Sequence, residues 1–231
     1  MGTSSSINPG VINSPLWQDV STRLNQYNSN PNISNARNLL GSFITASGGS
    51  VNISKGRSKN FGKAGVNQLY RFLNLVSVVS TNPEIAFQGI GITDYDSLSN
   101  EDLINKITFF LSANESNSFD NTSANLALNQ TIEMLLNRDQ DIDHLWDIDK
   151  SELIIFYLKR YFFEYFITLY YKKINEKDIN ITNLKNLFFE MIDSDNRTGD
   201  IPSITDFLND GHSLQDYISS VFEIILSIFE M

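Results

Sequence analysis

The stretch from Ser151 to Ile174 constrains the fold more than any other, because it is apolar or aromatic on nearly every face of a helix. Its apolar members are Leu153, Ile154, Ile155, Phe156, Tyr157, Leu158, Tyr161, Phe162, Phe163, Tyr165, Phe166, Ile167, Leu169, Tyr170 and Tyr171. A helix of this kind is buried at the centre of a bundle. Lys159, Arg160 and Glu164 fall in the middle of the stretch, where charges are costly in lipid. We therefore expect a central bundle helix with Ser151 as its cap, and no membrane span.

The other periodic segments predict further helices and no sheet. Helices are expected over residues 34–45, 65–79, 99–112, 124–137, 182–192 and 213–229, with Ser34 and Thr182 as caps and His212 as a turn or capping residue. Loops are expected over residues 52–65, 89–92, 114–123 and 193–202. The sequence predicts an all-α fold: a helical bundle around a long aromatic-rich helix, with an extended, loop-rich N-terminal section.

The expected organisation is an N-terminal arm and anchor, residues 1–33, followed by a helical domain, residues 34–231. Pro9-Gly10, Pro15 and Pro31 interrupt any periodicity in the arm, although a short helix around residues 17–27 is an alternative. Within the helical domain, residues 34–92 form a basic, loop-rich part and residues 99–231 an acidic bundle.

Charge is unevenly distributed along the chain. Residues 20–83 contain no Asp or Glu and carry seven basic residues, namely Arg23, Arg37, Lys55, Arg57, Lys59, Lys63 and Arg71. Subtracting this +7 from the formal net charge of −10 leaves −17 on the remainder. Such an acidic body repels nucleic acid, so any contact with a polyanion is expected to be confined to the basic third.

The composition removes several kinds of chemistry. The chain has no cysteine and only two histidines, His144 and His212, which excludes disulfides, thiolate metal sites and cysteine nucleophiles. We find no nucleophile elbow, acid–base pair or metal-ligand set. The N-terminus shows neither basic residues nor an apolar run, so no secretory signal is expected. The sequence predicts a non-enzymatic, cytoplasmic protein without metal or cofactor.

The segment from Gly56 to Ala64 resembles a phosphate-binding loop but fails its test. That motif has four residues between its glycines and then Lys followed by Ser or Thr. Here five residues separate Gly56 from Gly62, and Ala64 replaces the hydroxyl residue. A weaker hypothesis is that Lys55, Arg57, Lys59 and Lys63, ahead of a helix N-terminus, hold an anion. Solvated surface charge is the simpler interpretation.

Two acidic runs resemble calcium-binding loops, but both lack the glycine and the glutamate that such a loop requires. Counted from Asp139, the positions that require glycine and glutamate are His144 and Lys150. Counted from Asp193, they are Thr198 and Ile204. The first run is interpreted as a solvated acidic face able to meet a basic partner, and the second as a turn.

The first six residues, Met1-Gly2-Thr3-Ser4-Ser5-Ser6, contain no side chain that could pack. Such a run is expected to be extended and mobile, because no apolar burial offsets the entropy of ordering it. Removal of Met1 in a bacterial cytosol would expose the amine of Gly2. A frayed end without a role is the alternative. Pro15-Leu16-Trp17 is expected to fold onto the body and anchor this arm, because Trp17 carries a large apolar area.

Five elements in order carry a resemblance to a known family. They are Met1-Gly2-Thr3-Ser4-Ser5-Ser6, Pro15-Leu16-Trp17, Ala36-Arg37, Gly48-Gly49 and Gly56-Arg57. Over roughly the first third, the chain resembles QatB, the small accessory protein of the bacterial Qat anti-phage system. It departs from that pattern at Ile7-Asn8-Pro9-Gly10 and in a shortened proline run before Trp17.

The resemblance implies a defence operon that also encodes an ATPase, a QueC-like enzyme and a TatD-like nuclease. QueC-like enzymes activate a deazaguanine carboxylate with ATP and form a bond to nitrogen. A free glycine amine, with a pKa of about 7.7–8.0, is a suitable acceptor. We expect the QueC-like partner to bind Thr3, Ser4, Ser5 and Ser6 through their backbone and to modify Gly2. The partner-binding set also includes Pro15, Leu16, Trp17, Arg37, Arg57, Lys59 and Lys63, and the operon ATPase is a further candidate partner.

Three alternatives stay open from the sequence. The protein could be an interaction scaffold with an idle arm. It could be a nucleic-acid sensor that uses the basic third, with salt-sensitive binding through Arg57 and Lys59. The Met1-Gly2 and Ser6 pattern also fits N-myristoylation, which requires a eukaryotic transferase.

Overall fold

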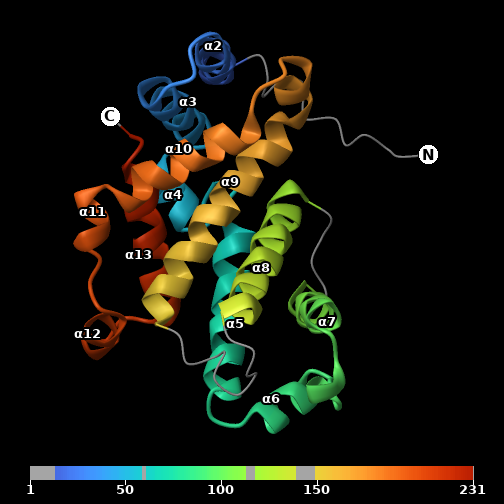
Figure 1. The fold of residues 1–231 in the computed structure, drawn as a ribbon. Helices are drawn as coiled ribbons and strands as arrows, with labels where there is room; N and C mark the ends of the chain where they lie inside the picture. The colour runs from blue at the N-terminus through green and yellow to red at the C-terminus, as the bar shows by residue number, and fades with distance from the viewer. Residues whose placement is uncertain (1–13, 59–60, 113–117, 139–148, 231) are drawn as a thin grey trace.

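A computed structural model describes residues 14–58, 61–112, 118–138 and 149–230. Within these ranges the chain forms twelve α-helices, one 3₁₀ turn and no strand, which confirms the all-α fold (Figure 1). The longer helices are α2 (Pro15–Ser29), α3 (Ile33–Ala46), α5 (Lys63–Val79), α7 (Asn100–Ser112), α8 (Phe119–Arg138), α9 (Lys150–Glu176), α10 (Ile181–Asp193) and α13 (Leu214–Ser227). The shorter elements are α4 (Ser50–Ser54), α6 (Pro83–Gly89), η1 (Tyr95–Ser97), α11 (Asn196–Gly199) and α12 (Ile204–Asn209).

Helix α9 is the axis of the molecule, as the sequence predicts. It runs through the centre, beside α5, α8 and α13, with α2 and α3 at one end and α6 and α7 toward the other (Figure 1). At 27 residues it spans about 40 Å, long enough to contact helices at both ends. Its cap is Asp149, whose side chain accepts the backbone N–H of Ser151, so the predicted cap, Ser151, is two residues too late.

Aromatic rings join the N-terminal third directly to α9. The ring of Phe43 on α3 meets Phe166 edge-on, with centroids 5.2 Å apart. The ring of Phe61 stacks on Tyr165 at 4.1 Å. Offset and edge-to-face ring pairs stabilise a core beyond their buried area. Buried residues of the basic and acidic segments thus belong to one hydrophobic cluster.

The charged residues in the middle of α9 lie at its surface and have partners. Lys159 forms an ion pair with Asp193 at 2.6 Å. Arg160 donates to the side-chain oxygen of Gln130 at 2.7 Å, and Gln130 donates to Glu164 at 2.8 Å. No helix in the described ranges is long and apolar enough to cross a membrane.

The N-terminal section is more helical than expected. Residues 15–29 form α2, which buries Val20, Leu24 and Tyr27, so the short helix weighed for residues 17–27 is present and longer. Helix α3 is capped by Asn32 and not by Ser34. The loop expected over residues 52–65 is shorter, because α4 occupies residues 50–54 and α5 begins at Lys63.

The remaining differences concern helix starts and short helices. Helix α8 begins at Phe119, five residues before the predicted start, and α10 is capped by Asn180 and not by Thr182. Helix α13 begins at Leu214, one residue after the predicted start, and Ser213 caps it through a capping box with Asp216. Helices α6 and α12 were not predicted, because six or seven residues are too few to display a helical period.

The last residues of the chain pack against the N-terminal third. The carboxylate of Glu230 accepts the backbone N–H of Ser50 at 2.9 Å and its hydroxyl at 2.6 Å, which caps α4. A Cβ at Gly41 on α3 would overlap the carbonyl oxygen of Phe229, so only glycine permits this approach. Arg197 donates to the carbonyl oxygens of Ser227 and Ile228 at the end of α13.

Candidate partner-binding surfaces

Trp17 fixes the start of α2 to the body of the protein. Its ring stacks on Tyr170 of α9 with centroids 6.3 Å apart, and meets Phe43 of α3 edge-on at 6.0 Å. This confirms that Trp17 packs onto the body. Leu16 does not, because 51% of its surface is exposed. An exposed first turn followed by a packed tryptophan places the point where the chain enters the fold at the protein surface.

The predicted acceptor and its flanking residues, Gly2 and Thr3 to Ser6, lie outside the described residues, as does Lys59. The other predicted partner-binding cations are separated. Arg37 is on α3, near enough to Asp195 to help lower the pKa of that carboxyl. Arg57 lines a groove beside α13, and Lys63 is exposed at the start of α5. The structure therefore does not gather them into one site.

The glycine-rich segment before α5 does receive an anion, and it is the protein's own Asp120. The carboxylate of Asp120, on α8, accepts the backbone N–H of Ala64 at 2.9 Å and that of Gly62 at 3.3 Å. The hydroxyl of Tyr161 donates to the same carboxylate. A helix N-terminus favours a negative group. The helix N-terminus of the anion hypothesis is thus occupied from within the chain, and binding of an outside anion by Lys55, Arg57, Lys59 and Lys63 stays a prediction.

Burial governs the ionisation of this buried pair. Desolvation raises the pKa of Asp120, while the hydrogen bonds from Tyr161, Ala64 and Gly62 act in the opposite direction. Desolvation and the neighbouring Asp120 charge raise the pKa of Tyr161 well above its usual value. Tyr161 therefore stays protonated and acts as a hydrogen-bond donor to Asp120.

Packing also explains the glycines that resembled a phosphate loop. A Cβ at Gly62, which has a φ of 105°, would overlap the carbonyl oxygen of Ile53. A Cβ at Gly65 would overlap the ring of Tyr161. Close approach of the backbone to α4 and to α9 requires glycine at both positions.

A polar groove of about 690 Å³ lies between α4, the following loop and α13. Arg57 and Lys55 line one wall, and Glu223 of α13 lies opposite, 3.9 Å from the amine of Lys55. Ser219 and Ser220 contribute hydroxyls. The cations of the basic third are thus offset by acidic residues of α13, so the groove has no single charge sign. A nucleic-acid interface at Arg57 stays a prediction.

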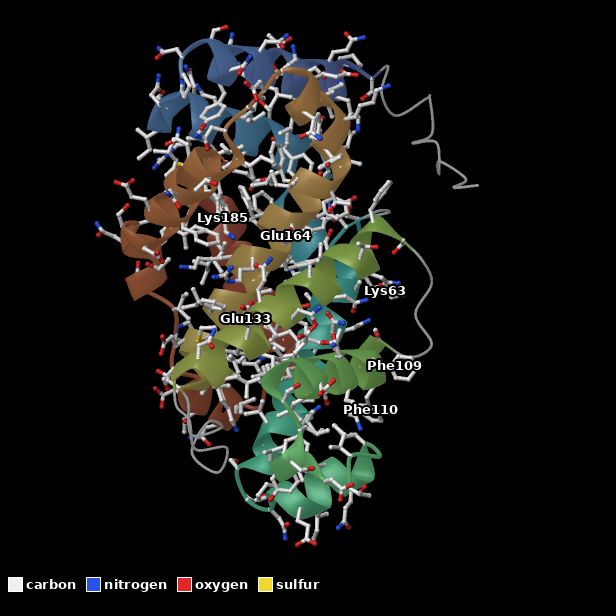
Figure 2. All side chains as sticks on the ribbon, turned by 45° about the vertical axis from the view of Figure 1, so that its right-hand side comes forward. Lys63, Phe109, Phe110, Glu133, Glu164 and Lys185 are labelled. Atoms are coloured by element: carbon white, nitrogen blue, oxygen red, sulfur yellow. The ribbon has the colours of Figure 1, made fainter. Side chains whose placement is uncertain are left out.

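A second polar cluster connects α8, α9 and α10, where Glu133, Glu164 and Lys185 come from the three helices in turn (Figure 2). Three cations surround the ring of Phe189: Lys159, Arg160 and Lys185 lie 5.2, 5.7 and 5.7 Å from its centroid. Burial and then the charge of Arg160 lower the pKa of Lys185, while Glu164 acts to raise it. These contacts tie the three helices together.

An apolar groove between the α6 end and α7 was not foreseen. It measures about 530 Å³ and is lined by Ile90, Ile92, Phe109 and Phe110, with Lys106 at its side. Phe109 is 78% exposed and Phe110 38% exposed, and both project from α7 at the edge of the molecule (Figure 2). No local sequence signal distinguishes this exposed pair from buried adjacent pairs such as Phe162 and Phe163 of α9.

The described residues contain no group of three or more His, Asp or Glu placed to hold a metal ion. The run from Asp193 to Asp200 forms a turn containing α11, in which Asp195 caps the helix and pairs with Arg197 at 2.9 Å. The acidic residues from Asp139 to Asp147 lie outside the described ranges.

Comparisons with protein-family models, curated proteins and solved structures found no match for this chain.

Proposed function

We propose that this protein is a non-enzymatic component of an anti-phage defence system that presents the amine of Gly2 to a QueC-like enzyme. The QatB resemblance of the first third supports this proposal. The structural observation that carries it is the packing of Trp17 on Tyr170 and Phe43, directly behind an exposed helix start. An arm fixed at this point is presented at the surface of a rigid helical body.

The length of the arm supports the proposal as well. Gly2 lies thirteen positions before Pro15, the start of α2, and a fully extended chain of that length spans roughly 45 Å. This is enough to reach the recessed active site of another protein while the helical body stays outside. The polar residues Thr3 to Ser6 can then form backbone hydrogen bonds along the partner's channel, as strands do in β-augmentation.

In the proposed reaction, the partner activates the carboxylate of a deazaguanine-type group with ATP. The unprotonated amine of Gly2 attacks the activated carbon, an amide bond forms, and the nucleotide leaves while the amine loses a proton. A glycine amine suits this step because no Cβ crowds it.

Mass spectrometry of the N-terminal peptide tests the proposal. The protein is purified from cells that carry the whole operon and from cells that lack the QueC-like gene. We expect Gly2 to carry added mass only in the first preparation. An unmodified Gly2 in cells with an intact, active operon would refute the proposal.

Paired variants test the role of the anchor. Trp17→Ala removes the ring that packs on Tyr170, and we expect a lower modified fraction. Leu16→Ala is the matched control, because Leu16 is exposed and its truncation leaves the packing intact. Equal modification of both variants would show that the anchor is dispensable.

An interaction scaffold with an idle arm is the second candidate, and the exposed Phe109 of the apolar groove favours it. Deletion of residues 2–6 separates the two functions. A scaffold keeps its defence activity after this deletion, whereas a substrate that must be modified at Gly2 loses it.

A further inference from the structure

The apolar groove beside α7 exposes aromatic side chains, although a helix that faces only solvent has polar residues on its outer side. Leu103, Ile107 and Leu111 already supply the buried face of α7. Phe109 and Phe110 add aromatic area on its outer side, where Phe109 is 78% exposed. Exposed aromatic residues next to an apolar hollow are typical of protein interaction sites.

The segment that forms the groove is acidic overall, although the charged residue that lines the groove itself is Lys106. The segment from Pro83 to Ser112 contains five acidic residues, Glu84, Asp94, Asp96, Glu101 and Asp102, and one basic residue, Lys106, for a net charge of −4. Glu84, Asp94, Glu101 and Asp102 are exposed. Lys63 of α5 lies on the same side of the molecule (Figure 2). The acidic residues still outnumber these two cations.

We propose that this groove binds a basic amphipathic helix of a partner protein, with one or two large apolar side chains seated between Ile90, Ile92 and Phe109. The apolar hollow supplies the contact area, and the exposed carboxylates of Glu84, Asp94, Glu101 and Asp102 attract lysine and arginine on the flanks of the partner helix. Helices that dock in this way present apolar anchors at positions i, i+3, i+4 and i+7.

The charges argue against two other occupants. A second copy of this chain would bring the same acidic segment to a symmetric interface, where like charges repel. An anionic membrane surface would be repelled by the same residues, and by a chain with a formal net charge of −10. The proposal rests on the groove and its charges alone, and does not depend on modification of Gly2.

Titration of the full chain with defined peptides tests the proposal. The probe is a 14-residue amphipathic helix made of leucine and lysine, and its counterpart carries glutamate in place of lysine. Two-dimensional amide NMR of the labelled protein locates binding. We expect the lysine peptide to shift resonances of residues 90–92 and 105–110, and the glutamate peptide to bind at least tenfold more weakly.

Variants separate the apolar contribution from the charge contribution. Phe109→Ser should weaken binding of the lysine peptide about tenfold or more, as expected for loss of an aromatic anchor. Tyr171→Ser is the matched control, since Tyr171 is 59% exposed on α9 and lies outside the groove. Glu84→Lys combined with Glu101→Lys should weaken binding of the lysine peptide and strengthen that of the glutamate peptide. Unchanged melting temperatures verify that the variants are folded.

The proposal is overturned if the shifts map elsewhere, if Phe109→Ser binds like the wild type, or if both peptides bind equally. Sedimentation equilibrium tests whether a second copy of the chain occupies the groove, and vesicle flotation tests whether a membrane does. A dimer that Phe109→Ser dissociates would assign the groove to a second copy. Vesicle binding that Phe109→Ser abolishes would assign it to a membrane, and either result rejects the basic helix.

Discussion

The hydroxyl of Tyr161 and the carboxylate of Asp120 are hydrogen-bonded inside the protein, at the point where α5 begins. The same hydroxyl accepts the backbone N–H of Gly62 at 2.9 Å. Three helices therefore meet at two side-chain groups, since Asp120 belongs to α8, Tyr161 to α9 and Gly62 precedes α5. This arrangement holds the glycine-rich segment against the aromatic core.

Replacing Asp120 with asparagine should destabilise the protein. One carboxylate oxygen of Asp120 accepts hydrogen bonds from the backbone N–H of Gly62 and the hydroxyl of Tyr161, and the other accepts from the backbone N–H of Ala64. In the asparagine variant, the NH₂ group replaces one of these oxygens and therefore faces a hydrogen-bond donor. An unsatisfied buried donor costs about 1–3 kcal/mol. Urea unfolding measures the loss. Asp94→Asn is the control, because Asp94 is exposed and makes no side-chain cap contact, and its stability should match the wild type.

The contribution of Asp120 to stability should decrease as pH rises. Burial raises its pKa in the folded protein above the usual value of 3.8, so the folded state holds this proton more tightly than the unfolded state. The resulting stability is complete below pH 3.8 and is lost as pH rises through the folded pKa. The difference in unfolding free energy between wild type and Asp120→Asn should therefore be larger at pH 4 than at pH 7. A constant difference would contradict the raised pKa.

Asp195 should show the opposite dependence. The hydrogen bonds from Arg197 lower its pKa from 3.8 to about 2, so its stabilising effect is present above pH 3.8 and lost as pH falls toward 2. Because Arg197 is partly exposed, we expect a contribution of roughly 1 kcal/mol. Asp195→Asn keeps an acceptor for the helix cap and removes the charge. Urea unfolding between pH 2 and pH 5 should show wild type and variant converging at the acidic end, and parallel curves would contradict this.

Gly65→Ala should destabilise the protein although alanine is the better helix former. The added Cβ would overlap the ring of Tyr161, which is fully buried and cannot move away. Overpacking of a core costs about 1–3 kcal/mol, more than the roughly 1 kcal/mol that alanine gains in a helix. Gly89→Ala is the matched control, since no atom lies within 4 Å of its added Cβ. Thermal unfolding should separate the two variants, and a stabilised Gly65→Ala would refute the overlap.

The features predicted from the sequence are those that depend on neighbours along the chain. The apolar stretch from Ser151 to Ile174 is long enough to specify a buried helix without knowledge of its partners, and α9 confirms it. The apolar period after Ser213 is likewise a local signal, and α13 begins at Leu214, beside the predicted start.

The features that escaped prediction depend on residues far apart in sequence. Asp120 lies 56 positions after Ala64, and no pattern around either residue indicates that they meet. The basic residues of the first third looked available for an anionic partner, yet Lys55 lies beside Glu223. Phe109 and Phe110 are both apolar residues of the helix expected over residues 99–112, and only the packing of α7 shows that both are exposed to solvent.

The contact between Ser50 and Glu230 bears on how a nascent chain acquires this fold. The two residues are 180 positions apart, so α4 cannot be capped until synthesis has reached Glu230. At about 5–20 residues per second, translation of the intervening segment takes roughly 10–40 s. During that interval the apolar sides of α3 and α5 lack their partners from α9 and α13, so the N-terminal third cannot complete its core before the end of the chain is made.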